Sequence, residues 1–224
     1  MERQTSKEMR PKVTKEGYME ISIIETQIPK PKGNEVLIKI EAAPINPSDL
    51  GRLLSYAADL SDINTMEGNH PTQIKIKLKE KLMSPLKPRL DQSLSLGNEG
   101  AGVVVDAGSE AKEMIGKTVG LAGGGMYCQY RCMPANNCLL MDDQTSPEEA
   151  ASSFVNPMTA LGFIETMKLE GHEALIHTAA ASNLGQMLIK ICITDSVPLI
   201  NIVRNSDQIE LLKNVGTNCV CSTS

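Results

Sequence analysis

The chain has 224 residues, 41% of them hydrophobic and 22% charged, which is typical of a globular protein with one large or two modest domains. Its net charge of −5 argues against a nucleic-acid partner, because such surfaces carry a basic excess. Residues 1–17 lack an apolar signal core, and no apolar run is long enough to cross a bilayer. Six cysteines without a signal are typical of reduced thiols, so we predict a cytoplasmic protein without a membrane partner.

Residues 1–17 are polar and charged, and we predict a flexible N-terminal tail. The following runs YMEISIIETQI and NEVLIKIEAAPI are typical of strands, separated by a turn at residues 29–34. The chain then breaks at Asn46-Pro47, where Ser48 or Asp49 is expected to cap a short helix.

The run QIKIKLKEKL at residues 73–82 alternates apolar residues with lysines. This pattern favours a solvated edge strand whose lysines discourage pairing with other edges. A patch for anionic substrates or a membrane surface is the alternative. Beyond it, GNEGAGVVVDAGS and further short strands broken by glycines predict a compact, barrel-like β domain.

The periodicity becomes helical at Ser146, which forms a capping box with Glu149. A helix is predicted to follow through Met167. Residues 173–205 then have the order of a βαβ unit: a strand at 173–177, a turn at 179–185, a helix at 184–193 and a strand at 197–203. Asn205 and Gln208 have the spacing of a capping box, which predicts one more helix, and Gly216 is its expected stop. Residues 219–221 begin a third strand.

The turn of this unit consists of small residues. In Ala179–Gly185 only the last residue of a glycine fingerprint is present, but alanines and serine still allow a close backbone approach. The amides at the start of the helix favour an anion. The alternative is an ordinary strand-to-helix turn. We therefore predict a cofactor site at Ala180, Ser182, Asn183, Leu184 and Gly185.

Arg204 ends the second strand of the unit, with no acidic residue until Asp207. An acid at this place binds the ribose 2′-hydroxyl of NAD, whereas an arginine accommodates the 2′-phosphate of NADP. The sequence therefore predicts NADP(H) as the cofactor, with a solvent-facing surface arginine as the alternative.

With these residues in view, the sequence resembles the medium-chain dehydrogenase/reductase superfamily, in its zinc-independent quinone oxidoreductase and enoyl-thioester reductase branch. Three segments carry the resemblance: INPSDL, GNEGAGVVVDAGS, and FVNPMTALGFIETM running into HTAAASNLGQ. It implies an α/β fold with a β-rich N-terminal part. Residues 18–153 would form a GroES-like substrate and catalytic domain, and residues 154–224 an incomplete Rossmann NADP-binding domain with a doubly wound parallel sheet.

The resemblance also bears on metal. Zinc-dependent relatives place a cysteine at the Asn46-Pro47 segment and a histidine in a G-H-E motif, which reads GNE at residues 97–99 here. Their structural zinc lobe uses four closely spaced cysteines, against three at positions 128, 132 and 138. Catalytic zinc needs about three protein ligands. We therefore predict no metal site.

The same resemblance implies catalytic roles. Asn46 would lie near the nicotinamide, and Thr159 belongs to the segment that contacts it. Tyr56 is the candidate proton donor, although its spacing from Asp49 is about one residue short; packing of an amphipathic ring is the alternative. The predicted function is transfer of a hydride from NADPH to an activated C=C bond or to a quinone or carbonyl group of a small molecule.

An alternative function follows from the expected sheet. A complete dinucleotide-binding sheet has six strands in the order 3-2-1-4-5-6, and this chain supplies the first two and the start of the third. The strand ALIHT would then have a bare edge. We expect a truncated chain that is weakly active or inactive, binding only a nucleotide or a partner, or a homodimer that covers the edge.

Overall fold

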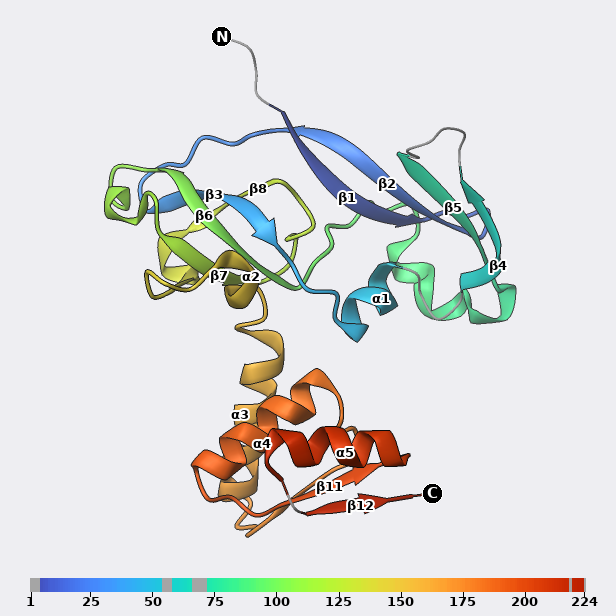
Figure 1. Ribbon diagram of the computed structural model, residues 1–224. Helices are drawn as coiled ribbons and strands as arrows, with labels where there is room; N and C mark the ends of the chain where they lie inside the picture. The colour runs from blue at the N-terminus through green and yellow to red at the C-terminus, as the bar shows by residue number, and fades with distance from the viewer. Residues whose placement is uncertain (1–4, 54–57, 66–71, 218, 224) are drawn as a thin grey trace. The chain divides into compact units, whose positions relative to one another are not determined.

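The computed structural model describes residues 5–53, 58–65, 72–217 and 219–223. The chain consists of two compact units, Met1–Ser152 and Ser153–Ser224 (Figure 1). No helix in these described ranges is long and apolar enough to cross a membrane.

The first unit contains two antiparallel sheets (Figure 1). The four-stranded sheet consists, in spatial order, of β1 (Thr5–Val13), β2 (Tyr18–Gln27), β5 (Gln73–Leu78) and β4 (Ala58–Thr65). The five-stranded sheet consists of β8 (Tyr130–Pro134), β3 (Glu35–Ala42), β6 (Glu99–Ala107), β7 (Thr118–Ala122) and β9 (Cys138–Leu140). The helices of the first unit are α1 (Pro47–Leu53) and α2 (Pro147–Ala150). Its 3-10 turns are η1 (Glu80–Leu82), η2 (Ser84–Arg89), η3 (Lys112–Met114) and η4 (Ala135–Asn137).

A strand replaces most of the predicted N-terminal tail. Residues 5–13 form β1, which pairs with β2 from Thr5↔Gln27 to Val13↔Met19. The prediction of a flexible tail was wrong for these residues, because Ser6 and Val13 turn inward and the backbone is paired along its whole length. Polar composition alone did not reveal this pairing.

The lysine-rich strand β5 is interior to its sheet, between β2 and β4, so the prediction of an edge strand was wrong. The predicted alternation is present, with Ile76 and Leu78 buried. Lys75 lies 4.5 Å from the ring centroid of Tyr18 and 3.5 Å from the Glu20 carboxylate. The Tyr18 ring and the Glu20 carboxylate on β2 therefore compensate the positive charge of Lys75, which lies on an interior strand of the sheet.

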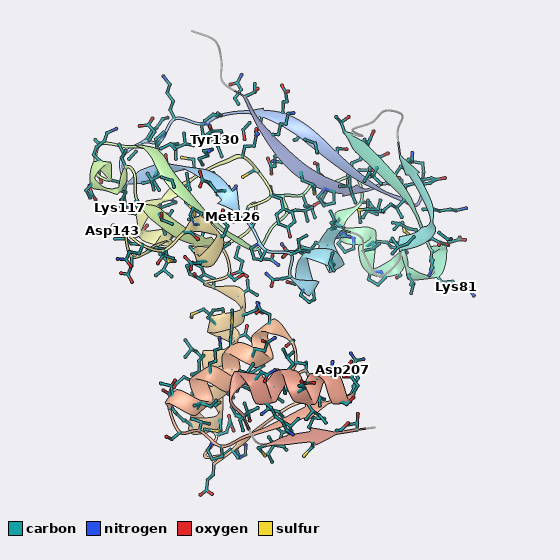
Figure 2. All side chains as sticks on the ribbon, in the orientation of Figure 1. Lys81, Lys117, Met126, Tyr130, Asp143 and Asp207 are labelled. Carbon is teal, nitrogen blue, oxygen red and sulfur yellow. The ribbon has the colours of Figure 1, made fainter. Side chains whose placement is uncertain are left out.

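Each sheet buries its own cluster of aliphatic side chains. Val36, Ile38 and Met126 belong to the core of the five-stranded sheet, with Met126 labelled in Figure 2. Val13, Met19, Ile21, Ile76 and Leu78 form the core of the other sheet. The two sheets are joined by backbone hydrogen bonds between β1 and residues 127–129, so that the unit is a single curled β structure.

The second unit is a βαβ arrangement as predicted (Figure 1). Its elements are α3 (Val155–Leu169), β10 (Leu175–His177), α4 (Asn183–Thr194), β11 (Leu199–Val203), α5 (Ser206–Val215) and β12 (Val220–Ser222). The strands are parallel in the order β10-β11-β12, which corresponds to one half of a Rossmann sheet.

Three predicted helix boundaries are confirmed by their caps. Ser146 and Glu149 form both hydrogen bonds of a capping box ahead of α2. The Asn205 side chain accepts a hydrogen bond from the Gln208 backbone N–H at the start of α5. Gly216 ends α5 with a φ of 111°, a left-handed conformation that glycine adopts without strain.

Candidate active site

The turn between β10 and α4 is built to place a helix start beside a cavity. Ser182 is the N-cap of α4, and its Oγ accepts a hydrogen bond of 3.1 Å from the Gly185 backbone N–H. The other N–H groups of the first turn have no acceptor within a helix, and they carry its positive dipole end. This turn can therefore hold an anion.

Gly185 is required by packing. A Cβ atom at this position would overlap the carbonyl group of Ala180. The last glycine of the eroded fingerprint thus lets α4 begin directly against the turn.

A cavity of about 480 Å³ joins this turn to the end of β11. Its lining consists of Thr178, Ala179, Ala180, Ala181, Ser182, Ile202, Val203, Arg204 and Gln208. It therefore lies at the carboxyl ends of two parallel strands, where ligands bind in open α/β sheets.

The structure brings three of the predicted cofactor residues to this cavity: Ala180, Ser182 and Arg204. Asn183, Leu184 and Gly185 follow in the first turn of α4 but do not line it. Thr159 lies on α3 and is also absent from the lining; its Oγ1 donates to the Val155 carbonyl oxygen at 2.7 Å.

Arg204 is exposed, and no acceptor among the described residues binds its guanidinium. Its backbone N–H donates to Oε1 of Gln208 at 2.8 Å. Gln208, which the sequence indicated only as part of a helix cap, therefore fixes the backbone at Arg204 and also lines the cavity.

The first unit contains a polar cluster of Asn46, Asp49, Asn98 and Glu99, which we call the Asn46 cluster. Asn98 is half-buried, and the other three residues are buried. The two oxygens of Asp49 accept backbone N–H groups of Asn46 and Asn98, each at 3.0 Å. The Asn46 side chain donates to Glu99 at 2.8 Å. These bonds clamp the start of α1 against the start of β6.

The predicted cap of α1 was wrong. Ser48 and Asp49 lie inside the helix, which begins at Pro47. The Asp49 carboxylate instead accepts the Asn46 backbone N–H from within the first turn. Tyr56, the candidate proton donor, lies outside the described residues.

Tyr127 lies next to the Asn46 cluster. Its hydroxyl donates to the Pro44 carbonyl oxygen at 3.0 Å. Burial, and then the nearby Asp49 carboxylate, raise the pKa of Tyr127 to about 12. The phenol therefore stays protonated at neutral pH and remains a donor.

The described residues contain no group of three or more His, Cys, Asp or Glu that could hold a metal. Amides stand at positions 46 and 98, and the Asn46 amide is already bound by Glu99. Burial raises the pKa of both Cys128 and Cys138 to about 11. The Asn46 cluster thus offers amides and carboxylates, in place of the thiolate and imidazole groups that commonly bind zinc.

Known proteins share this sequence pattern. The family profile of the alcohol dehydrogenase GroES-like domain matches residues 32–143. The mitochondrial enoyl-acyl-carrier-protein reductase of Xenopus tropicalis is 29% identical over 201 residues, covering 86% of this chain and 49% of that protein. The corresponding Caenorhabditis elegans protein is 28% identical over 187 residues, covering 82% of this chain and 46% of that protein. The chain thus spans about half the length of the curated relatives it matches.

A solved structure from Mesorhizobium loti, assigned as an NADPH:quinone reductase, agrees in fold. It superposes with a TM-score of 0.68 at 28% identity, covering 98% of this chain and 60% of that one. Because the GroES-like profile covers half of the chain and the structural match extends over both units, the chain belongs to the medium-chain dehydrogenase/reductase superfamily, in its quinone oxidoreductase and enoyl reductase branch.

Proposed function

We propose that this chain is an NADPH-dependent oxidoreductase that reduces an activated C=C bond or a quinone or carbonyl group without zinc. The observation that carries the proposal is the cavity in which the turn before α4 and the end of β11 meet, with Arg204 at its wall. A helix start and an arginine with no partner among the described residues, in one cavity, suit a ligand with both a pyrophosphate and a second phosphate.

The residues of the second unit have distinct tasks in this proposal. The backbone amides at the start of α4 would bind the pyrophosphate, and Gly185 allows the approach. The guanidinium of Arg204 would bind the 2′-phosphate as a bidentate, charge-assisted partner. When bound, NADPH supplies the hydride; the protein supplies binding, orientation and polarisation.

The roles of the three catalytic candidates remain proposals from the resemblance. Asn46 would contact the nicotinamide, and Glu99 would set the orientation of its amide. Thr159 would accept a hydrogen bond, since its own proton is directed to Val155. Tyr56 would return a proton to the substrate, as a phenol of ordinary pKa is protonated at neutral pH.

The absence of zinc from the mechanism is supported by the residue types in the Asn46 cluster. Amide side chains are poor zinc ligands compared with thiolate and imidazole. A carbonyl polarised without metal needs hydrogen-bond donors that strengthen as negative charge develops. We further infer a cytoplasmic location from the sequence, although several relatives carry the word mitochondrial in their names.

The experiment that tests this function is a titration of the chain with NADPH and with NADH, following nicotinamide fluorescence. We expect Arg204→Ala to weaken NADPH binding about tenfold or more and to change NADH binding little, since a charged hydrogen bond to the 2′-phosphate is lost. Lys213→Ala on α5 is the control, because it removes an exposed positive charge from the same unit. If neither nucleotide binds, the oxidoreductase proposal is wrong.

The second candidate function is binding of a nucleotide or a partner without catalysis. It is favoured by β10, which within the described residues pairs only with β11, and by Ile176, whose side chain is 65% exposed. A second copy of the chain would cover this edge. Nucleotide binding without turnover of quinones or enoyl thioesters would support this candidate over the first.

A further inference from the structure

A groove of about 350 Å³ lies in the first unit, at the joint between its two sheets. Four segments wall it: residues 7–9 on β1, Ile23 on β2, residues 40–43 at the end of β3, and residues 126–129. Backbone hydrogen bonds join these walls, since Met9 N–H donates to the Tyr127 carbonyl oxygen at 2.9 Å and Ile40 N–H donates to that of Gln129 at 3.0 Å. The shape of the groove is therefore set by paired backbone.

The groove is mainly apolar, and neither hydrophobic core fills it. Met9 packs against the core of the four-stranded sheet, whereas Ile40 and Ala43 pack against that of the five-stranded sheet. Met126, labelled in Figure 2, is buried in the latter core, and Ile23 lines the groove with 43% of its surface exposed. The two methionines can adapt their shape to an apolar ligand. At the volume of one water molecule for each atom, the groove suits a ligand of about twelve non-hydrogen atoms.

One wall of the groove supplies hydrogen-bond donors. Lys7 and Gln129 both line it and are bound to each other, because Lys7 N–H donates to Oε1 of Gln129 at 2.9 Å and Gln129 N–H donates to the Lys7 carbonyl oxygen at 3.0 Å. With Oε1 engaged, the Nε2 group of Gln129 remains a donor. An ammonium and an amide donor thus come from two neighbouring, exposed side chains.

The carboxylates of the lining already have cationic partners. Glu8 binds Arg10 at 3.0 Å, and Glu41 binds Lys39 at 3.1 Å. Lys7, in contrast, forms no ion pair with any residue that the structure describes. The charge of the groove that is left without a partner is therefore positive, and it belongs to Lys7.

A ligand that matches both parts of this groove has an apolar body and an anionic head. Burial of the body removes apolar surface of Ile23 from water, and a carboxylate accepts hydrogen bonds from both donors of the wall. A cationic head would instead meet the Lys7 ammonium.

We propose that the groove binds a small amphiphilic anion, a carboxylate with an aliphatic chain. The carboxylate would bind Lys7 and Gln129, and the chain would lie against Met9 and Ile23. The site shares no residue with the cavity of the second unit. It does not depend on the proposed reductase activity.

Sodium octanoate, titrated into the full chain, tests this site. The readout is the set of methionine ¹³C-methyl NMR signals, with those of Met9 and Met126 assigned by Met9→Leu and Met126→Leu. We expect both signals to shift and to saturate, whereas Met158, which is 61% exposed on α3, should not respond. Butyrate should bind at least about tenfold more weakly, because its chain buries less apolar surface. A Met158 shift equal to the other two, or equal binding of butyrate, would overturn the proposal.

Lys7→Gln tests the head-group contact. We expect it to weaken octanoate binding about fivefold, as for a charge-assisted hydrogen bond at an exposed site, and to leave binding of neutral 1-octanol unchanged. Lys30→Gln is the matched control, because it removes an exposed positive charge of the same unit that does not line the groove. Equal weakening by both variants, or equal loss of octanoate and 1-octanol binding in Lys7→Gln, would contradict a carboxylate at Lys7.

Ile23→Ala tests the apolar contact. It should weaken octanoate and 1-octanol to the same extent, about fivefold, because apolar contact area is lost for both ligands. Ile115→Ala is its control, since Ile115 is 45% exposed in the same unit and lies outside the groove. Both Lys7 and Ile23 are exposed, so their variants keep the fold. If octanoate produces no saturable shift of Met9 and Met126 at millimolar concentration, the groove is not a site for such anions.

Discussion

The Nδ2 group of Asn46 donates a hydrogen bond of 2.8 Å to Oε1 of Glu99, and both side chains are buried. The residues are 53 positions apart, and they bring the start of α1 to the start of β6. Glu99 thereby determines which end of the Asn46 amide faces the carboxylate. Asn46, the candidate residue for contact with the nicotinamide, is thus oriented by Glu99, which belongs to a different segment of the chain.

Removal of the Glu99 side chain should destabilise the first unit. Glu99→Ala removes the carboxylate acceptor of this buried hydrogen bond, and we expect a loss of about 2 kcal/mol in the free energy of unfolding. Glu99→Gln retains a side-chain oxygen and similar volume, so its loss should be smaller, about 1 kcal/mol. Urea unfolding followed by circular dichroism measures both values.

The control for this pair is Glu25→Ala, an exposed position on β2 that should change stability by less than about 0.5 kcal/mol. Equal stability of Glu99→Ala and the control would show that the buried hydrogen bond does not hold these segments. A large loss in Glu99→Gln would instead indicate that the negative charge itself is required.

Gly185 and Gly162 should respond to the same substitution with opposite signs. Gly185→Ala forces a methyl group into the Ala180 carbonyl, so α4 must move from the turn; we expect a loss of about 2 kcal/mol and weaker nucleotide binding. Gly162 lies within α3, and a Cβ there would meet nothing within 4 Å. Gly162→Ala should stabilise the helix by about 0.5 to 1 kcal/mol.

Thermal unfolding of the two variants, together with NADPH titration, measures these effects. Gly162→Ala serves as the control for the added methyl group, because it keeps the cavity unchanged. An unaltered NADPH affinity in Gly185→Ala would contradict a role for the helix start in binding the cofactor.

Glu20 should make the first unit sensitive to acid. Its carboxylate lies 2.8 Å from the Lys12 ammonium and 3.5 Å from that of Lys75, and its side chain is 16% exposed. The hydrogen bond and charge of Lys12 lower the pKa of Glu20. A lowered pKa stabilises the folded state above the ordinary glutamate value, and this contribution disappears as the pH falls through the folded-state pKa.

Glu20→Gln should therefore cost about 1 kcal/mol at neutral pH, because the lysines remain partly exposed. The cost should shrink as the pH falls below the ordinary glutamate pKa, and it should vanish once the folded-state carboxylate is protonated. Urea unfolding as a function of pH measures the difference between the two proteins. Glu25→Gln on the same strand is the matched control and should show no such dependence. A constant difference across the acid range would rule out the ion pair as its source.

Local signals predicted the second unit well. The capping box at Ser146 and Glu149, the cap at Asn205 and the stop at Gly216 each depend on residues within one helical turn. The turn before α4 and Arg204 are likewise adjacent to the strands that position them. The sequence was therefore sufficient to predict the turn and the strand end that line this cavity.

Long-range pairing was not predictable in the same way. The polar strand β1 and the lysine-rich strand β5 were misassigned because their stability comes from β2, through backbone pairing and through Glu20. The Asn46 cluster was missed as a network for a related reason: two of its hydrogen bonds join residues about fifty positions apart. No local periodicity indicates such a contact.

The open edge of β10 leads to a prediction about association. Ile176 is 65% exposed on a strand that, in the described residues, has a neighbour on one side only. Unpaired backbone groups beside an apolar side chain favour pairing with another strand. We expect the chain to self-associate, and Ile176→Lys to shift it toward the monomer, because a lysine on an edge opposes pairing.

Sedimentation velocity over a range of protein concentrations measures this shift. Leu169→Lys provides the control: Leu169 is 85% exposed at the end of α3, so the same charge is introduced at an apolar surface residue that is not part of a strand. A monomer at every concentration, or an equal shift in both variants, would contradict pairing through β10. Dissociation by Ile176→Lys alone would identify the edge of β10 as the contact, because only there does the added charge oppose the formation of a continuous sheet.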